Sequence, residues 1–388
     1  MNFDVRECRT TLAQQLPEMT HTLERLVNID SGSYCVEGVN RVVDIMEAGL
    51  RTLGFTIDRR PMSACADQLV ATRTLSGRGR LLILGHADTV WPEGTVAEWP
   101  FSIDGDRATG PGVGDMKGGL VMALSSLRYL FAHGFDDLAS ITFFLVPDEE
   151  LGSVHSRPAI EAAAQEADFV LVLEPGRPGG GIVTARGALG AFQLCAHGRS
   201  AHCAVNYAKG ASAIRELAVK VEPLEALSDP EHGAVVNVGM FHGGAARQVV
   251  PPEARMDIDL RARTQAQADA MIAEIRRIGA ERRNEGVALD LRGGLTRPAF
   301  TDAHNGPLRD IALDLAAQLD IPLFEVPPTG GGSDGNFSAA LGIPTLDALG
   351  PVCENICARD ESISLASLAE RGALFCGLIL QLNNTRKI

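Results

Sequence analysis

The segment RLLILGHADTV, residues 80–90, joins an apolar run to two polar side chains. Residues Arg80–Leu84 predict a short buried strand, because a continuous apolar run of this length is typical of a strand that is covered on both faces. His86 and Asp88 follow directly. The carboxyl ends of strands in open α/β sheets carry ligand sites. The segment therefore predicts a central strand with a polar site next to it.

Two later segments repeat this arrangement. The strand predicted at Ile141–Val146 is followed by the acidic run 148–150, and the strand predicted at Phe169–Leu173 is followed by Glu174. Amphipathic patterns predict helices at residues 17–28, 40–53, 116–132 and 307–319 and from residue 364 onward, with a further strand at 345–349. Strands that alternate with helices are typical of an α/β sheet.

The middle of the chain has a different pattern. Glycines over residues 176–181 indicate a crossing between domains. Strands are predicted near residues 188–196, 235–241 and 254–262, and helices near 211–221 and 265–278. Because α/β features resume after about Pro298, we expect a small α+β domain that is inserted into the α/β domain.

The composition indicates a folded protein of two or three domains, since the chain has 388 residues, of which 45% are hydrophobic and 22% charged. The net charge of −14 argues against binding to nucleic acid or to an anionic membrane. Residues 1–15 lack the apolar core of a secretory signal, and no apolar run is long enough to span a bilayer. We expect a cytoplasmic protein whose eight scattered cysteines are mostly reduced and buried.

The polar residues at the strand ends are candidate ligands for divalent cations, which bind imidazole and carboxylate groups that converge from several elements. Asp115 in the glycine-rich segment GPGVGDMKGG, residues 110–119, is a further candidate. Each has a simpler explanation: His86 as a loop histidine, Asp115 as a helix cap, and the acidic run 148–150 as a solvated turn. Their recurrence at consecutive strand ends favours a metal site in which one acid binds metal and its neighbour takes a proton from water.

Five motifs carry a resemblance to a known family. They are HADTV at 86–90, GPGVGDMKGG at 110–119, DEELGS at 148–153, EP at 174–175 and GRSAH at 198–202. Together they resemble the dinuclear zinc aminopeptidases, carboxypeptidases and aminoacylases, and within that family most of all the folate-cleaving glutamate carboxypeptidases. The resemblance covers nearly the whole chain. It implies an α/β zinc-peptidase-like catalytic domain, residues 1–181 and 293–388, with a central mixed sheet flanked by helices, and an inserted α+β dimerisation or lid domain, residues 182–292.

The resemblance also implies roles for the residues at the strand ends. His86 and Glu174 would hold one zinc ion, Asp115 would bridge two ions, and Glu150 would hold the second. Glu149 would be the general base, and Asp88 would orient His86. The implied cofactors are two zinc ions, with cobalt or manganese as alternatives.

Further residues are implied to bind substrate. His202 and Asn237 would reach the site of the neighbouring subunit of a homodimer and bind the carbonyl oxygen or carboxylate of the substrate. Arg261 and the turn Gly331, Gly332 and Ser333 resemble segments that grip the carboxylate of the departing amino acid. The alternatives are a strand-end surface charge for Arg261 and an ordinary tight turn for the glycines. Arg186 is a less diagnostic candidate for anion binding.

One segment departs from the family pattern. Where the family has a second zinc-binding histidine, this chain has Cys357, in GPVCENICARDE at residues 350–361. A thiolate can replace the histidine as a zinc ligand. Alternatively, only one metal is kept, or Cys357 is an ordinary thiol in a protein that has changed its function. Cys353 can pair with Cys357 under oxidation only if the geometry allows it.

These observations predict a homodimeric, metal-dependent hydrolase that cleaves the amide bond of an N-acyl amino acid or short peptide and releases a free carboxyl-terminal amino acid. The alternative is a descendant with one metal or without hydrolytic activity, such as a binding protein or an enzyme of other acyl chemistry. Cys357 keeps the alternative open, and the presence of Glu149 argues for hydrolysis.

Overall fold

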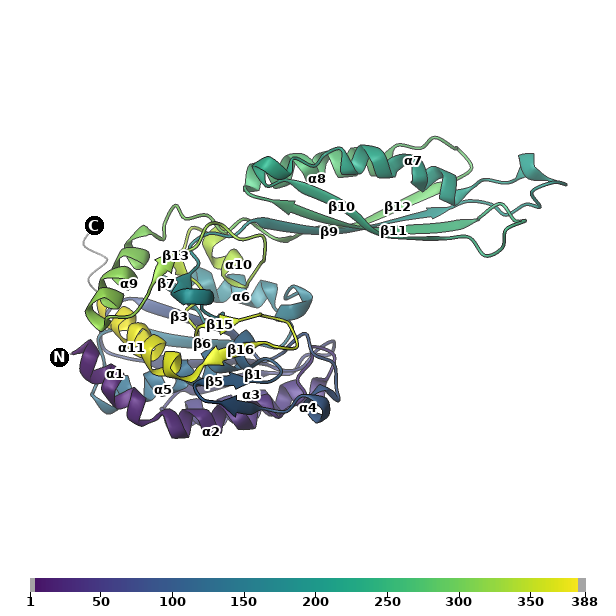
Figure 1. Ribbon diagram of the computed structural model, residues 1–388. Helices are drawn as coiled ribbons and strands as arrows, with labels where there is room; N and C mark the ends of the chain where they lie inside the picture. The colour runs from purple at the N-terminus through teal and green to yellow at the C-terminus, as the bar shows by residue number, and fades with distance from the viewer. Residues whose placement is uncertain (1–3, 383–388) are drawn as a thin grey trace. The chain divides into compact units, whose positions relative to one another are not determined.

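The computed structural model describes residues 4–382 and divides into two compact units, which are shown in Figure 1. The first, here called the outer unit, contains the described residues up to Ala185, Thr301–Pro327 and the described residues from Ser333 onward. The second, the inserted unit, contains Arg186–Phe300 and Pro328–Gly332. The prediction from the sequence placed the inserted domain at residues 182–292, so the compact unit starts and ends somewhat further along the chain.

The outer unit is built on a six-stranded sheet of order β1-β2-β6-β3-β7-β14. Its strands are β1 (Thr56–Arg60), β2 (Gln68–Thr74), β3 (Arg80–His86), β6 (Ser140–Val146), β7 (Phe169–Val172) and β14 (Thr345–Leu346). Strand β3 is parallel to β6 and β7, and β14 is parallel to β7, whereas β1 and β2 are antiparallel to their neighbours. This confirms the predicted central mixed sheet.

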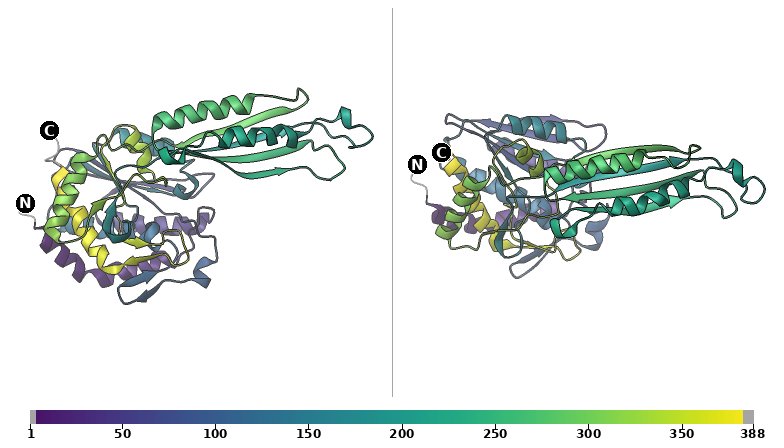
Figure 2. Two further views of the ribbon diagram at one scale, coloured as in Figure 1. Left: turned by 45° about the horizontal axis from the view of Figure 1, so that its top comes forward. Right: turned by 90° about the horizontal axis from the view of Figure 1, so that it is seen from above.

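Helices cover both faces of this sheet, as the views in Figures 1 and 2 show. Leu81 and Ile83 of β3 face one core cluster, and Leu82 and Leu84 face another, as expected from the alternation of side chains along a strand. The first cluster includes side chains of α1 (Val5–Gln14), α2 (Leu16–Val27), α3 (Val36–Thr52), α5 (Gly119–Ala132), α9 (Gly306–Leu319) and α11 (Leu365–Gln381). The second includes those of α6 (Arg157–Gln165) and α10 (Gly335–Ala340). The apolar run that marked β3 is therefore a strand buried on both sides.

Smaller elements complete the outer unit. A four-stranded sheet has the order β15-β16-β5-β4. Its strands are β15 (Cys353–Glu354), β16 (Ser362–Ser364), β5 (Arg107–Thr109) and β4 (Ser102–Asp104), and β8 (Gly181–Ile182) pairs with β13 (Phe324–Glu325). The remaining short elements are α4 (Thr95–Glu98), η1 (Val113–Gly118), η2 (Glu149–Leu151) and η3 (Pro178–Gly180). Because β16 pairs with β5, the segment that contains Cys357 is tied to the segment that leads into Asp115.

The inserted unit is a four-stranded antiparallel sheet of order β10-β11-β9-β12 with two helices on one face. Its elements are β9 (Ala188–His197), η4 (Tyr207–Lys209), α7 (Ala213–Glu225), η5 (Pro230–His232), β10 (Val235–Gly243), β11 (Glu253–Ala262), α8 (Gln265–Ala280) and β12 (Ala288–Arg297). Helix α8 begins with a capping box, in which the side chains of Thr264 and Gln267 each bond to the other's backbone amide. The predicted α+β character of this region is thus observed.

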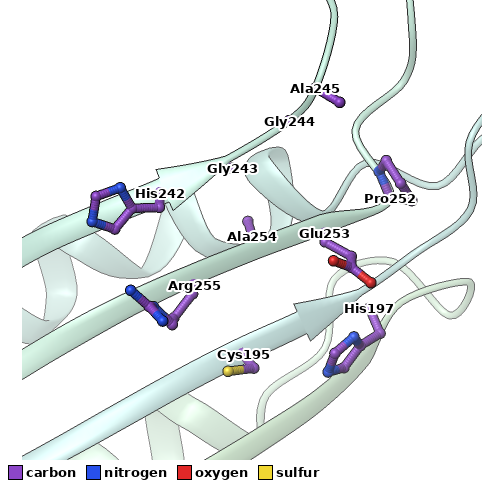
Figure 3. A pocket seen from close by; sticks show the side chains of 10 residues that line it. All are labelled: Cys195, His197, His242, Gly243, Gly244, Ala245, Pro252, Glu253, Ala254 and Arg255. Atoms are coloured by element: carbon purple, nitrogen blue, oxygen red, sulfur yellow. The ribbon is translucent and has the colours of Figure 1, made fainter.

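The other face of this sheet carries polar side chains, which Figure 3 shows in close-up. Cys195 and His197 of β9 and Glu253 and Arg255 of β11 alternate with buried residues along their strands, and His242 lies opposite Arg255 on β10. Antiparallel sheets commonly have one packed face and one polar face. These side chains line a hollow of about 500 Å³.

The predicted elements agree with the structure in place and type, with two local differences. The helix expected from residue 116 starts as the irregular segment η1, because Asp115 and Met116 have non-helical backbone angles, and the regular helix α5 begins only at Gly119. The strand expected at 345–349 pairs with β7 only at Thr345 and Leu346. Among residues 4–382, no helix combines the length and the apolar character that crossing a bilayer requires.

Candidate metal centre

The parallel strands of the outer unit bring four candidate ligands to one edge of the sheet. His86 is the last residue of β3, Glu149 and Glu150 follow β6, and Glu174 follows β7. Strands β6 and β7 both pair with β3 in parallel, so their carboxyl ends meet at the same edge. Except for the half-buried Glu150, these side chains are buried. The residues that the sequence singled out are therefore neighbours in space.

The ligand atoms form two overlapping groups, in each of which all atoms lie within 4.8 Å of one another. One group consists of His86, Glu149 and Glu174, and the other of His86, Asp115 and Glu150. Nε2 of His86 is 3.1 Å from Oδ1 of Asp115 and 3.7 Å from Oε1 of Glu174. The geometry thus holds the histidine between two carboxylates.

Asp115 also meets Cys357. The thiol Sγ of Cys357 donates to Oδ2 of Asp115 at 3.3 Å, while the other oxygen of Asp115 faces His86. One carboxylate therefore lies between the imidazole and the thiol, as a bridging ligand would. Asp115 does not cap α5, because the residue before that helix is Gly118 and Asp115 has φ −108° and ψ 92°.

Glu361 links the segment that carries Asp115 to the segment that carries Cys357. Its buried Oε1 accepts the backbone N–H of Gly114 at 2.9 Å and that of Asp115 at 3.3 Å. Its Oε2 accepts the backbone N–H of Cys357 at 3.0 Å. The sequence motif contained Glu361 but did not reveal this role, because the bonded amides lie more than 240 positions apart in the chain.

Asp88 makes more contacts than its predicted role of orienting His86 requires. Nδ1 of His86 is 2.9 Å from the backbone oxygen of Asp88 and 3.4 Å from its Oδ1. The carboxylate of Asp88 also accepts the backbone N–H groups of Glu149 and Glu150, each at 3.1 Å, and the hydroxyl of Ser33 at 2.7 Å. Asp88 therefore fixes the backbone of the acidic run as well as contacting the histidine.

Burial and like charge shift the pKa values of this centre. Burial, together with the charge of Asp115, raises the pKa of Glu150 and of Glu174 well above the ordinary value. For His86, burial alone would lower the pKa, but the hydrogen bonds to Asp115 and Asp88 outweigh it and the pKa is raised. Burial and the charge of Asp115 also raise the pKa of the Cys357 thiol. Crowded acids of this kind are stabilised in their charged forms by a cation.

The residues present fit divalent metal ions. Oε1 of Glu150 is buried and has no hydrogen-bond partner in the structure. Because buried polar atoms normally have a partner, this oxygen is suited to bind a metal ion. Imidazole, carboxylate and thiol groups are the donors that zinc prefers. His86, Asp115, Glu150, Glu174 and Cys357 are thus all placed to contribute, although neither of the two groups described above includes Cys357.

Cys353 does not pair with Cys357, and both are free thiols. The buried side chain of Cys353 packs against the backbone of Gly114, where a Cβ atom would collide with its sulfur. Cys353 therefore supports the loop that carries Asp115.

The predicted substrate-binding residues of the inserted unit are more exposed to solvent than the buried residues of the metal centre. His202 and Asn237 are exposed, and Nδ1 of His202 accepts the backbone N–H groups of Ala204 and Val205 at 3.2 and 3.3 Å. Arg261 forms an ion pair with Asp259, with 2.7 Å between Nε and Oδ2. His202 contacts backbone groups of its own loop, whereas Asn237 lies opposite Asp259, the ion-pair partner of Arg261, on the neighbouring strand.

The glycine turn is held by two arginines of the inserted unit. Nη1 of the buried Arg186 donates to the carbonyl oxygens of Gly331 and Gly332 at 3.2 and 3.4 Å, and Nη1 of Arg261 donates to that of Gly330 at 3.0 Å. Ser333 belongs to the outer unit, where its buried hydroxyl donates to Asp347 at 2.6 Å. Arg186, the less diagnostic candidate, is thus a structural support of the turn.

Comparisons with known proteins agree with this geometry. The sequence profile of Peptidase family M20/M25/M40 matches residues 82–381. Carboxypeptidase G2 of Pseudomonas sp. (strain RS-16) is 30% identical over 340 residues, which cover 86% of this chain and 81% of that protein. Among solved structures, an M20 family metallo-carboxypeptidase from Sulfolobus solfataricus superposes with a TM-score of 0.74 at 17% identity, over 93% of this chain and 99% of that one. A Bacillus subtilis protein described as a dinuclear metal-binding peptidase of the M20 family gives a TM-score of 0.68 at 15% identity, over 96% and 99%.

Proposed function

Because this chain belongs to Peptidase family M20/M25/M40 and is a metal-dependent peptidase or amidohydrolase, we propose that it releases a carboxyl-terminal amino acid from an N-acyl amino acid or short peptide, as a glutamate carboxypeptidase does. The observation that carries the proposal is the convergence of Asp115, Glu149, Glu150 and Glu174 around His86 at one sheet edge. The likeness to carboxypeptidase G2 supports the glutamyl preference.

In this proposal the metal ligands are divided as follows. His86 and Glu174 would hold one ion, Glu150 and Cys357 would hold the second, and Asp115 would contribute to both, with zinc as the first choice of metal and cobalt or manganese as alternatives. Divalent ions held there would supply Lewis acidity and a water acidic enough to lose its proton near neutral pH.

Glu149 is the proton carrier of the proposed reaction. Its backbone is fixed by Asp88 and its side chain is buried beside His86 and Glu174, so that its carboxylate is held at the reacting centre. It accepts a proton from the attacking water and returns it to the leaving amine. Since only one carboxylate is needed for this transfer, the neighbouring Glu150 is left to bind metal.

The inserted unit completes the proposed site. We place His202 and Asn237 at the active site of a second subunit, where the imidazole would bind the oxygen that gains negative charge during the reaction. Arg261 and the turn Gly331, Gly332 and Ser333 would bind the carboxylate of the departing amino acid. The exposure of His202 and Asn237 supports a role at such a surface. The proposal therefore includes a homodimer through the inserted unit.

The expected cytoplasmic location is part of the same proposal. All eight cysteines are free, which suits a reducing compartment.

The test is a panel of N-acyl amino acids that differ in the amino acid released, assayed with the purified protein after loading with zinc, cobalt or manganese. We expect release of the free amino acid, with N-acyl glutamates among the best substrates. Activity on acyl amino acids without a glutamyl preference would overturn the glutamate assignment. No release from any member with any metal would overturn the proposed function.

The second candidate is a descendant with a single metal or without hydrolysis, which Cys357 favours. Its thiol proton bonds to Asp115, and its raised pKa opposes the thiolate form that binds metal. Metal content separates the two candidates, because the second requires one ion or none per chain in the wild-type protein.

A further inference from the structure

One residue of the metal centre is a cysteine that is exposed to solvent. Of the eight cysteines of the chain, Cys203 and Cys357 are exposed, and the other six are buried or half-buried. Cys203 belongs to the inserted unit, whereas Cys357 belongs to the outer unit. Cys357 is therefore the exposed thiol of the unit that carries the metal centre.

The surrounding structure fixes the position of Cys357. Its Sγ donates to Oδ2 of Asp115 at 3.3 Å, and its backbone N–H donates to Oε2 of the buried Glu361 at 3.0 Å. Its backbone φ of 58° lies in the left-handed region, which residues other than glycine rarely adopt. Because such a conformation persists only where neighbouring contacts impose it, the thiol is held at Asp115 by the fold.

An independent observation points to a cation beside this thiol. Oε1 of Glu150 is buried and has no hydrogen-bond partner in the structure, and Glu150 belongs to a candidate ligand group with His86 and Asp115. Cys357 lies outside that group, but the negative charges of Asp115 and Glu150 both act on its thiol. The sulfur therefore lies at the edge of the place where the second ion would bind.

A thiol brings a reaction that imidazole and carboxylate groups lack, which is exchange with a disulfide. A thiol that binds a metal ion is deprotonated, so the loaded centre supplies a thiolate. The Cys357 thiolate attacks one sulfur of a small disulfide, the S–S bond breaks, and a new S–S bond forms to Cys357. The other sulfur leaves as a thiolate and takes a proton from water. Cys357 is thereby oxidised and the leaving sulfur is reduced.

The product no longer has the properties of the free thiol. The sulfur of a mixed disulfide has neither a negative charge nor a proton. It is therefore a poor metal ligand, and it cannot donate to Asp115 as the thiol does. Modification of Cys357 would thus remove one ligand of the second ion.

Charge near Cys357 selects the kind of disulfide. Asp115 and Glu150 are acidic, and Arg359, two positions from Cys357, is paired with Glu98 at 3.2 Å between Nη2 and Oε2. The whole chain has a net charge of −14. Because like charge opposes the approach of an anion, a cationic or uncharged disulfide is favoured over an anionic one.

The neighbouring Cys353 is not placed to resolve the mixed disulfide. It lies four positions before Cys357, but it is buried, and its sulfur packs against the backbone of Gly114. Its Sγ also donates to the carbonyl of Glu354 at 3.5 Å. Attack by Cys353 would require it to leave this packing, so the mixed disulfide persists until a small thiol reverses it.

We propose that Cys357 is a site of reversible modification by small disulfides that carry no negative charge, and that this modification releases the second metal ion and stops hydrolysis. The inference rests on the proposed function, in which Cys357 holds that ion. It adds regulation of the same centre by the thiol–disulfide state of its surroundings.

The test uses the whole protein, loaded with zinc and freed of excess metal. Cystamine, a cationic disulfide, is added, a chromogenic chelator measures released zinc, and mass spectrometry of peptides locates the modified cysteine. We expect release of about one zinc ion per chain as Cys357 gains one cysteamine group, and renewed zinc binding after reduction and reloading. The anionic glutathione disulfide should react roughly tenfold more slowly, and the uncharged bis(2-hydroxyethyl) disulfide at an intermediate rate.

Matched variants separate Cys357 from the other thiols. Cys203→Ser, which lacks the other exposed thiol, should lose zinc as the wild type does. Cys357→His, which keeps a metal ligand but no thiol, should retain its zinc in cystamine.

The outcomes distinguish this inference from the proposed function. Attachment to Cys357 without release of zinc, modification of other cysteines alone, or zinc loss from Cys357→His at the wild-type rate would overturn the inference. A faster reaction with glutathione disulfide than with cystamine would overturn the assigned class of disulfide. Hydrolysis of the acyl amino acids by a protein that keeps its zinc in cystamine would overturn the inference alone. Zinc release through Cys357 in a protein that hydrolyses none of them would support the inference and overturn the proposed function.

Discussion

The outer unit and the inserted unit hold their candidate residues in opposite ways. In the outer unit, His86, Asp115 and Glu174 are buried, both carboxylates lie within 4 Å of the His86 ring, and all three groups have shifted pKa values. In the inserted unit, His202 and Asn237 are exposed, and Nδ1 of His202 accepts hydrogen bonds from the backbone of its own loop. Each unit has its own hydrophobic core, so the difference does not come from incomplete folding.

This difference in burial determines whether the candidate residues of each unit can act without a second surface. Buried, crowded acids around an imidazole form a centre that needs only metal ions to be complete. Exposed residues that do not cluster need another surface before they can act together on a substrate. In our proposal the outer unit therefore carries the chemistry, and the remaining substrate contacts come from residues supplied across a subunit interface.

The largest expected effect is that of Glu149→Ala, which tests whether the outer unit carries the chemistry. Removing the proton carrier should lower kcat by about 10²–10⁴-fold while metal content and the circular dichroism spectrum stay the same. Glu166→Ala, which removes an exposed acid of the same unit, is the matched control. Unchanged turnover of Glu149→Ala would show that the reaction uses another base.

The next effect tests whether the inserted unit acts across subunits. His202→Ala should lower kcat by about 10²–10³-fold, as does the loss of one group that stabilises an oxyanion. Because His202 is exposed, its replacement should leave the fold intact, and the melting temperature checks this.

A mixture of the two variants extends this test. After subunits exchange between Glu149→Ala and His202→Ala dimers, one intact site forms in each mixed dimer, so about a quarter of wild-type activity should return. No recovery, despite mixed dimers seen by native mass spectrometry, would place His202 in its own subunit's site or outside the site.

A smaller effect, a change in metal content, tests whether Cys357 is a metal ligand in the outer unit. Because Cys357 contacts Asp115, which bridges the two ions in our proposal, Cys357→Ser should release about one metal ion per chain, and Cys357→His should retain it. Elemental analysis of the purified variants gives the answer. One ion or none in the wild type, with a second ion only in Cys357→His, would favour the descendant with a single metal.

The smallest effect concerns stability and tests how the buried centre depends on charge. Burial and the charge of Asp115 raise the pKa of Glu361 from 4.5 to about 7. Above pH 4.5 the unfolded chain loses the proton of Glu361 while the folded protein keeps it, so the stabilising contribution of the protonated side chain is lost as pH rises toward 7. Relative to Glu361→Gln, the free energy of unfolding of metal-free wild type should fall by at most about 3 kcal/mol over this range.

Urea unfolding of both proteins at pH 5, 6, 7 and 8, with a chelator present, measures this difference. A difference that is the same at every pH would show that Glu361 does not titrate in this range. Glu325→Gln, which changes an exposed acid of the outer unit, should show no such trend.

Much of the fold follows from local patterns. The apolar runs at 81–84 and 141–146 predicted β3 and β6 because strands buried on both faces need apolar residues at every position. Helices α1, α6 and α10 and strands β1, β2 and β12 are among the elements that were not predicted. In β1 the half-buried positions 57 and 59 alternate with exposed ones, but only Ile57 is apolar, so the sequence lacks the alternation of apolar and polar residues that marks a strand.

The residues of the site could be predicted from the sequence, but the hydrogen bonds that position them could not. His86 ends one strand and Glu150 and Glu174 follow two others, and the parallel arrangement of those strands is enough to bring the three residues together. The hydrogen bonds of Glu361 to the loops of Asp115 and Cys357, and those of Asp88 to the acidic run, were missed. They depend on backbone amides, which every residue except proline has, so residue type gives no signal.

By itself the sequence determined which residue types end each central strand, and with them the family and the class of chemistry. Only the tertiary structure decided that Cys357 meets Asp115 across 242 positions of the chain, and that Glu361 bonds to the segments of both. The physical reason is that strand pattern and ligand chemistry are local properties of the chain. Distances between loops are set by the packing of all the elements that carry them.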